Sequence, residues 1–176
     1  DRAMKHLLLA LAVLALSACQ EEEAKAPPPP VEMTQEALSF FCQMNISDHG
    51  GPKAQLHLEG YPQPIFFAQV RDMVAYVKSP ERDAKIIAIY VSDMNLAPSW
   101  DLPGTTNWIT AEGAQYVVGA PVRGGMGAPE IVPFGNYEGA EAFVTKYGGQ
   151  VLKMSEIPDD AALGAVDLAQ VLETPL

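Results

Sequence analysis

Three side chains able to ligate a metal ion lie close together in the stretch FFCQMNISDHGGPKAQ, residues 40–55. They are the thiol of Cys42, the thioether of Met44 and the imidazole of His49, and a Gly-Gly-Pro turn follows them. A second thioether, Met126, lies far along the chain in the stretch RGGMGA. Glycines offer a methionine few apolar neighbours and permit unusual backbone angles. Met126 is therefore a candidate ligand rather than a candidate core residue.

The two sulfur atoms of the first stretch favour monovalent copper. We expect extended backbone from Cys42 to Met44, which would point both side chains to the same side. Soft thiolate and thioether ligands select Cu(I), whereas zinc would accept Cys42 and His49 but has no use for Met44. One thiolate with neutral thioethers and an imidazole neutralises Cu(I), while a divalent ion would keep a positive charge that burial penalises. The residues therefore predict a Cu(I) site.

Other interpretations of these residues remain open. Cys42 could be a small buried hydrophobe beside Phe40 and Phe41, and His49 could be an ordinary histidine of a surface turn. Cys42 could also be a nucleophile with His49 as its base, although no third group or oxyanion hole is evident. A second histidine, His57, alternates with leucines in a predicted strand, and we expect it to be structural or exposed to solvent.

The N-terminal segment predicts export and lipidation. Residues 1–18 contain a basic start and an apolar run too short to span a bilayer, as in a signal peptide. The stretch LSAC, which ends at Cys19, resembles a bacterial lipobox. That resemblance implies cleavage before Cys19 and its acylation, and Gln20 at the next position implies sorting to the outer membrane. Residues 19–36 are rich in glutamate and proline and predict an extended tether.

Charge and cysteine content limit the possible functions. The chain of 176 residues has a formal net charge of −11, and removal of residues 1–18 leaves nine basic and 21 acidic side chains, a charge of −12. This balance argues against binding of nucleic acid and suits attraction of cations. With Cys19 acylated, Cys42 is the one remaining thiol, so an intramolecular disulfide is impossible. Metal coordination would shield such a thiol from oxidation in an exported compartment.

The remaining sequence contains one pattern twice: strand, strand, helix, strand. The first copy is AQLHLEG, PIFFAQ, QVRDMVAYVKS and AKIIAIYVSD, and the second is AQYVVGA, PEIVPF, NYEGAEAFVTKYGG and QVLKMSEI. We expect an α+β fold of two small tandem ββαβ units, with helices packed on antiparallel sheets. The predicted segments after the tether are 37–95 (first unit), 96–108 (linker), 109–157 (second unit) and 158–176 (flexible tail, either a frayed short helix or disorder).

Finer expectations follow from single residues of this pattern. In the first strand Gln55, His57 and Glu59 alternate with leucines, which predicts a strand buried on one face only. Met73 lies on the apolar stripe of the first helix and is expected in the core. Gly148 follows the second helix and is expected to cap its C-terminus.

The motifs FCQMNISDHGGPKAQ and VVGAPVRGGMGAPEIVPF, in this order and spacing, resemble those of the NosL family of lipoproteins. The resemblance covers residues 39–157 and the lipobox. It implies two ββαβ units like those of organomercurial lyase, and a periplasm-facing Cu(I)-binding chaperone rather than an enzyme. Such chaperones help assemble the copper–sulfide centre of nitrous oxide reductase and act with an ABC-type membrane complex.

The same resemblance assigns roles to residues of this chain. It implies that Cys42 and Met44 match the Cys-x-Met motif of the family, that His49 matches its downstream histidine, and that Met126 matches its glycine-flanked methionine. The usual central glycine of the first motif is Gln43 here, and glutamine restricts the backbone where glycine would be free. Two alternatives remain: a thiol enzyme related to organomercurial lyase, and a metal-free binding module for the reductase.

Overall fold

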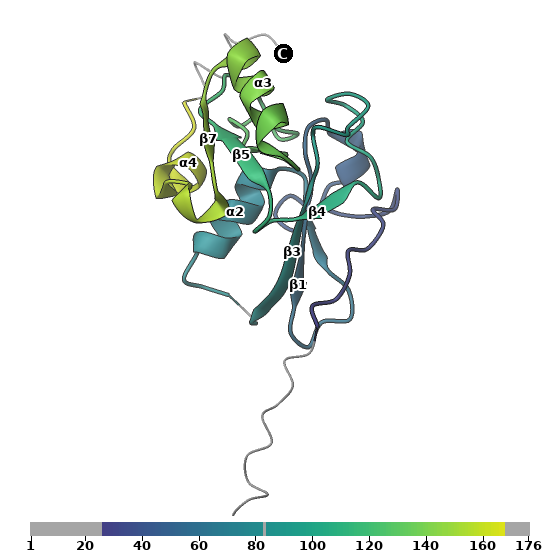
Figure 1. Cartoon of the computed structure of the whole chain (residues 1–176). Coiled ribbons are helices and arrows are strands. Elements are labelled where there is room, and N and C mark those ends of the chain that lie inside the picture. Colours follow the sequence, from purple (N-terminus) through teal and green to yellow (C-terminus); the bar gives the residue numbers. More distant parts are fainter. Residues whose placement is uncertain (1–25, 83, 168–176) are drawn as a thin grey trace, which may run out of the picture.

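The computed structural model describes residues 26–82 and 84–167 (Figure 1). The signal peptide predicted for residues 1–18 and the lipidation site Cys19 lie outside these residues. In the described part of the chain, no helix has the length and apolar character needed to cross a membrane. The elements in chain order are η2 (Ile46–Asp48), β1 (Ala54–Leu58), β2 (Ile65–Phe67), α2 (Val70–Lys78), β3 (Ile86–Ser92), β4 (Trp108–Thr110), β5 (Gln115–Val118), β6 (Val132–Phe134), α3 (Tyr137–Tyr147), β7 (Gln150–Leu152), η3 (Met154–Glu156) and α4 (Asp159–Leu163).

These elements form two antiparallel sheets, and the predicted α+β repeat is confirmed. The first sheet has the order β2-β1-β3-β4 and the second has the order β6-β5-β7. Each unit is built as strand, strand, helix, strand, with its first strand at the centre of the pairing. The first sheet gains a fourth strand, because β4 pairs with β3 and places Thr110 opposite Tyr90. The segment predicted as a linker, residues 96–108, thus runs directly into the edge of the first sheet.

Local sequence sets the limits of α3. The side chain of Asn136 accepts a hydrogen bond from the backbone N–H of Gly139 and caps the helix N-terminus. At the other end Gly148 has φ 83°, a left-handed conformation that a glycine adopts without steric cost. The predicted C-cap is therefore confirmed.

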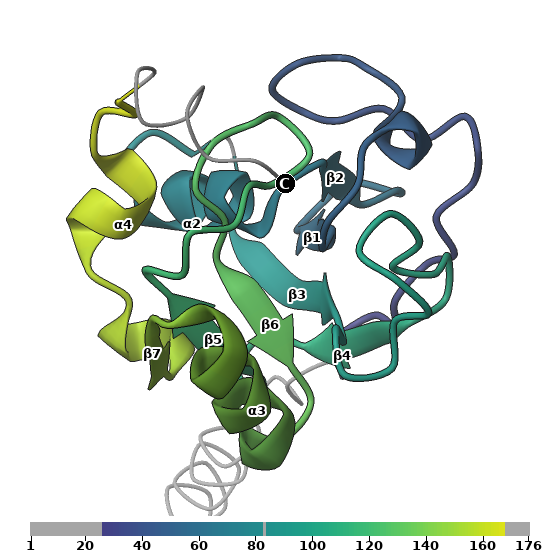
Figure 2. The same cartoon turned by 90° about the horizontal axis from the view of Figure 1, so that it is seen from above.

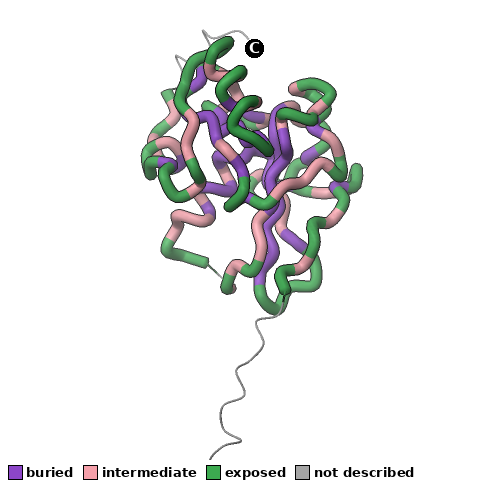
Figure 3. Tube along the Cα trace, in the orientation of Figure 1, coloured by how far each residue is buried: buried purple, intermediate pink, exposed green. Residues whose placement is uncertain are grey.

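The main core surrounds α2 and joins the two units. Met73 of α2, Leu56 of β1 and Tyr116 of β5 are fully buried in one apolar cluster, and the buried stretches of these strands meet at the centre of the molecule (Figure 3). Val117, which points to the opposite face of β5, packs instead in a second cluster beneath α3. The second sheet is thus covered by α2 on one face and by α3 on the other.

The first strand differs from its prediction, because both of its faces are buried. All five residues of β1 are buried, including Gln55 and His57. The Gln55 side chain accepts a hydrogen bond from the N–H of Val31 at 2.7 Å and donates one to the carbonyl of Val31 at 2.8 Å. His57 lies 3.1 Å from the Gln55 side-chain oxygen and is structural.

The N-terminal segment that covers β1 was predicted as part of an extended tether. It is fixed to the fold from Pro28 onward, where Tyr90 donates a hydrogen bond to the Pro28 carbonyl at 2.7 Å. Met33 is 5% exposed, and its N–H donates to the carbonyl of Thr105 at 2.8 Å. The residues from Pro28 onward are therefore part of the fold and not a free spacer.

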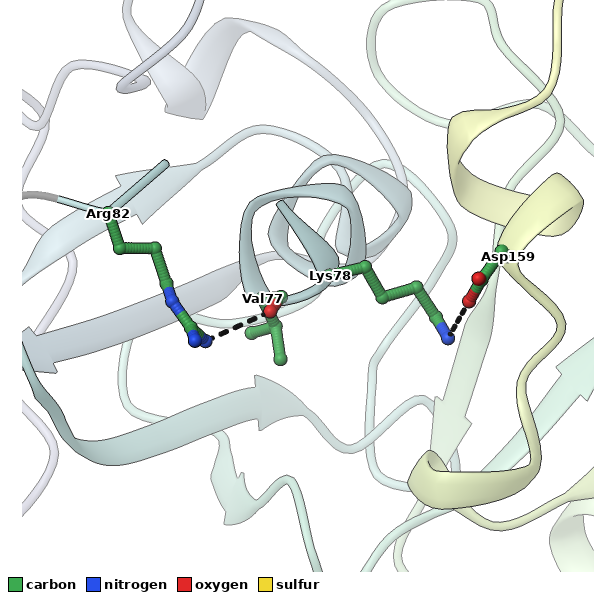
Figure 4. Close-up of polar contacts among 4 residues, drawn as sticks. All are labelled: Val77, Lys78, Arg82 and Asp159. Carbon is green, nitrogen blue, oxygen red and sulfur yellow. Dashed lines mark hydrogen bonds and ion pairs between the residues drawn. The ribbon is translucent and has the colours of Figure 1, made fainter. Parts of the chain in front are cut away.

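The predicted flexible tail also begins with ordered structure. Residues 159–163 form α4, which packs against α2 and buries Ala162. Lys78 of α2 forms an ion pair with Asp159 at 2.6 Å, and Arg82 donates a hydrogen bond back to the carbonyl of Val77 (Figure 4). The weak periodicity of this short segment hides a helix that tertiary packing stabilises.

Candidate metal centre

The stretch that carries Cys42 and Met44 is a tight turn, so the prediction of extended backbone was wrong. The N–H of Ser39 donates to the carbonyl of Met44 at 2.9 Å, and the N–H of Gln43 donates to the carbonyl of Ser39 at 2.8 Å. Gln43 at the tip has φ 56°, which reverses the chain. Leu38 and Asn45 pair across the base of this turn as an isolated bridge.

Aromatic rings fix this turn to the body of the protein. The N–H of Phe40 donates to the carbonyl of Phe66 at 2.7 Å, and the Phe40 ring meets Tyr76 edge-on at 5.5 Å between centroids. The Phe41 ring packs against Phe67 at 5.6 Å. Cys42 itself is a free thiol of intermediate exposure, not a core residue. The rings therefore supply the packing, and the thiol stays within reach of a ligand.

His49 lies in a second turn, which follows η2. The N–H of Gly51 donates to the carbonyl of Trp100 at 2.7 Å, and Gly51 has φ 82°. The ammonium group of the fully buried Lys53 donates to the carbonyls of Gly50 at 2.9 Å and Gly51 at 2.8 Å. His49 Nε2 is buried and has no hydrogen-bond partner. A buried nitrogen without a partner is costly unless it binds something, so this ring fits a ligand role.

Met126 lies at the tip of a third turn, between β5 and β6. The N–H of Gly127 donates to the carbonyl of Gly124 at 2.9 Å, and the N–H of Met126 donates to Gln69 Oε1 at 3.0 Å. The next residue back, Gly125, packs directly on the His49 turn: a Cβ added there would lie 2.6 Å from His49 Cβ. In Figure 2 this green loop arches over the region between α2 and β2, on the same side of the molecule as η2.

The predicted ligands thus lie on three neighbouring turns at one end of the molecule. Met44 is 48% exposed and Met126 is 39% exposed, so both thioethers are accessible from solvent. Within the described residues, no three side chains from His, Cys, Asp and Glu are grouped closely enough to hold a metal ion.

Behind these turns lie two buried ionisable residues that the sequence patterns did not single out. Glu130 Oε1 accepts hydrogen bonds from the N–H groups of Arg71 and Ile131, both at 2.9 Å, while Oε2 has no partner. Burial raises the pKa of Glu130 to about 8, and burial lowers the pKa of Lys53 to about 8. Both residues stand within the motifs quoted above, where an ionisable residue just before a buried strand was the available signal.

The burial of Glu130 predicts a pH-dependent stability that Glu130→Gln should remove. At pH values between 4.5, the ordinary pKa of a glutamate, and about 8, the folded protein keeps a proton on Glu130 that the unfolded chain loses. The contribution of Glu130 to wild-type stability therefore falls as the pH rises through this range. The amide keeps the acceptor for both backbone N–H groups. From pH 5 to 7 the variant should gain stability relative to wild type by at most about 1.4 kcal/mol per pH unit. Urea unfolding at both pH values measures this, and parallel pH profiles for the two proteins would contradict it.

Comparison with known proteins identifies the family of this chain. The family model NosL matches residues 30–162. The chain belongs to the NosL family. The copper-binding lipoprotein NosL of Achromobacter cycloclastes is 51% identical over 165 residues, covering 93% of this chain and 85% of that protein. The copper-binding lipoprotein NosL of Stutzerimonas stutzeri is 33% identical over 159 residues, covering 89% and 80%.

A solved NosL structure agrees with the fold. The crystal structure of the copper chaperone NosL from Shewanella denitrificans matches with a TM-score of 0.69 and 31% identity, and covers 74% of this chain and 97% of that chain. The family resemblance and the α+β fold inferred from sequence are thereby confirmed. The names of these relatives describe copper-binding proteins and a chaperone and none names an enzyme, in agreement with the prediction.

Gln43 has an unusual conformation for a residue with a side chain. It adopts the left-handed conformation that favours glycine. Its side chain donates hydrogen bonds to the carbonyls of Phe40 at 2.8 Å and Ser39 at 3.3 Å, which offsets part of the backbone cost.

Variants of Gln43 test this strain. Gln43→Gly should be more stable than Gln43→Ala by about 1 kcal/mol, because alanine keeps the Cβ that the left-handed conformation disfavours. At a position with right-handed or extended backbone angles the alanine variant would be the more stable one, since glycine increases the entropy of the unfolded chain. Urea denaturation of the two variants measures the difference, and a more stable alanine variant would show that the turn carries no such strain.

Proposed function

We propose that this chain is a lipid-anchored Cu(I) chaperone that faces the periplasm and delivers copper for assembly of the copper–sulfide centre of nitrous oxide reductase. The observation that carries the proposal is the contact between two turns far apart in sequence. Gly125, beside Met126, packs on His49, whose buried Nε2 has no partner. The names of the relatives, copper-binding lipoprotein and copper chaperone, support the choice of metal.

Each proposed ligand has a distinct role. The Cys42 thiolate carries the one negative charge of the set and binds Cu(I) most strongly. Met44 and Met126 contribute neutral thioethers, and the free Nε2 of His49 is a further ligand. The set neutralises the charge of Cu(I), which limits the desolvation cost of holding the ion at a partly buried site.

The exposure of the thioethers suits transfer rather than storage. Because Met44 and Met126 are both more than a third exposed, a ligand of the recipient can approach the metal from their side. It can bind copper before Cys42 leaves, so free Cu(I) is never released. Nitrous oxide reductase, or the ABC-type membrane complex that assists its maturation, is the proposed recipient, and nucleic acid is not a partner.

The anchor places this chemistry at a membrane. We propose acylation at Cys19 and attachment to the outer membrane, with the folded part on the periplasmic side. Several acyl chains on one residue give stable attachment, where a single chain would be marginal. The segment before Pro28 would then be the spacer that lets the metal-binding end reach a partner.

Anaerobic titration of the lipid-free protein against a cuprous chelator tests the proposal. We expect one Cu(I) per chain, held more tightly than by the chelator and released to apo nitrous oxide reductase on mixing. Failure to retain Cu(I) would contradict the chaperone and favour a metal-free binding module. Turnover of an organomercurial by the purified protein would instead favour the thiol enzyme.

A further inference from the structure

The three turns of the candidate site meet at one short segment, Ala68-Gln69, between β2 and α2. The first connection comes from the Cys42–Met44 turn. Ser39, which holds that turn through its N–H and carbonyl, also accepts a hydrogen bond from the N–H of Ala68 on its side-chain oxygen at 3.3 Å. Ser39 and Ala68 are both fully buried. This turn is thus tied to the start of the segment.

The second connection comes from the His49 turn. Lys53 Nζ, which binds the carbonyls of Gly50 and Gly51, also donates to the carbonyl of Ala68 at 3.3 Å. The loop that carries Met126 reaches the same carbonyl from the other side, because a Cβ added at Gly125 would lie 3.1 Å from the Ala68 oxygen. Close packing of this kind is possible only while that loop residue has no side chain.

The third connection is the side chain of Gln69, which is 2% exposed. Gln69 is the N-cap residue of α2, yet it makes no side-chain capping bond. Its Oε1 instead accepts the N–H of Met126 at 3.0 Å, and its side chain also hydrogen bonds to Asp72. The N-terminus of α2 is capped from the opposite direction, because Glu130 accepts the N–H of Arg71. Helix and loop therefore hold each other through two reciprocal hydrogen bonds, one buried and one partly buried.

We propose that Gln69 is a positioning residue of the copper site, which holds Met126 against the other two turns. The inference rests on the proposed Cu(I) function, but it concerns a residue that contacts no metal. Without the hydrogen bond from the Met126 N–H to Gln69, the Met126 turn keeps its internal hydrogen bonds and the packing of Gly124 and Gly125, but no side chain in the described part of the chain holds the Met126 backbone. Its thioether would then sample positions away from Cys42 and His49, and copper affinity would fall.

Gln69→Leu tests this role, since leucine is apolar, removes the hydrogen bonds and adds no sulfur that could bind Cu(I). Loss of a residue that orients a ligand lowers metal affinity about tenfold to a hundredfold, and we expect about tenfold here. Gln55→Leu is the matched control, because Gln55 is also a fully buried, hydrogen-bonded glutamine. The control should lose stability but keep the affinity for Cu(I) within about twofold of wild type.

Two further measurements separate positioning from general destabilisation. Hydrogen exchange of the Met126 N–H in the copper-free protein should become at least about tenfold faster in Gln69→Leu and stay unchanged in Gln55→Leu. In a Met126→Leu background, Gln69→Leu should cause no further loss of copper affinity, since the thioether that Gln69 positions is gone. If Gln69→Leu does not fold, Gln69→Asn shortens the side chain and serves the same tests.

The outcomes are distinguishable. A wild-type protein that does not bind Cu(I) would overturn the proposed function, while exchange at Met126 would still report whether Gln69 holds that turn. Wild-type copper affinity in Gln69→Leu, or an equal further loss in the Met126→Leu background, would overturn the positioning role and leave the proposed function intact.

Discussion

Cys42→Ser should lower the affinity for Cu(I) by at least about a hundredfold, because orienting residues alone change metal affinity about tenfold to a hundredfold and Cys42 is the charged ligand itself. Serine preserves the size of the side chain but offers a hard, neutral oxygen, which binds Cu(I) poorly. Since Cys42 is half-buried and makes no disulfide, the fold should be unaffected. The measurement is competition with a cuprous chelator under anaerobic conditions.

Methionine variants provide the controls for this experiment. Met44→Leu and Met126→Leu each remove one thioether from an exposed position and should weaken binding less than Cys42→Ser does. Met73→Leu changes a core methionine outside the site and should leave copper affinity unchanged. If Cys42→Ser competes for Cu(I) as well as the wild type does, the Cys42 thiolate is not a ligand of the metal.

Lys53→Met should destabilise the protein by about 2 to 4 kcal/mol, since it leaves buried carbonyl groups without a donor. Lys53 Nζ donates to three carbonyls, those of Gly50, Gly51 and Ala68, and none of these acceptors is removed by the substitution. Because the pKa of Lys53 is lowered to about 8, the experiment should be done near pH 6.5, where the amine is charged. Urea unfolding measures the change.

Lys78→Met is the matched control for this experiment. Lys78 makes an ion pair with Asp159, whose side chain is 80% exposed (Figure 4). Such pairs contribute between zero and about 1 kcal/mol, so this variant should lose far less stability than Lys53→Met. Equal effects of the two substitutions would show that the buried ammonium group does not hold the His49 turn in place.

Short-range patterns in the sequence predicted the repeat correctly. The 3.6-residue spacing of Val70, Met73 and Val74 gave α2, and the asparagine and glycine at the two ends of α3 are local capping signals. These features depend on contacts within a few residues, which is why sequence alone sufficed. The two-fold recurrence of the pattern then limited the fold to paired α+β units.

Features that depend on distant segments were missed. The alternation in β1 correctly placed Leu56 in the core, but it could not show that Val31 would bind Gln55 and cover the other face. The helix α4 is too short to form alone and depends on its contacts with α2. Both features depend on elements that lie far apart in sequence, so the alternation in β1 missed its second covered face and the tail could be assigned only as a frayed short helix or disorder.

The candidate site was likewise predicted only in part from the sequence. The residue types at Cys42, Met44, His49 and Met126 indicated soft-metal chemistry, yet the left-handed turn at Gln43 contradicted the extended backbone expected there. The residues that join the turns, such as Gln69, carry no metal-binding chemistry and give no pattern along the chain. Only the three-dimensional structure reveals them.

X-ray absorption at the copper edge of the anaerobically loaded, lipid-free protein tests the central claim most directly. We predict a Cu(I) spectrum with three sulfur neighbours, from Cys42, Met44 and Met126, and at most one nitrogen neighbour, from His49. Met126→Leu should reduce the sulfur count by one. A coordination shell made only of nitrogen and oxygen, or a sulfur count that is unchanged in Cys42→Ser, would contradict the account.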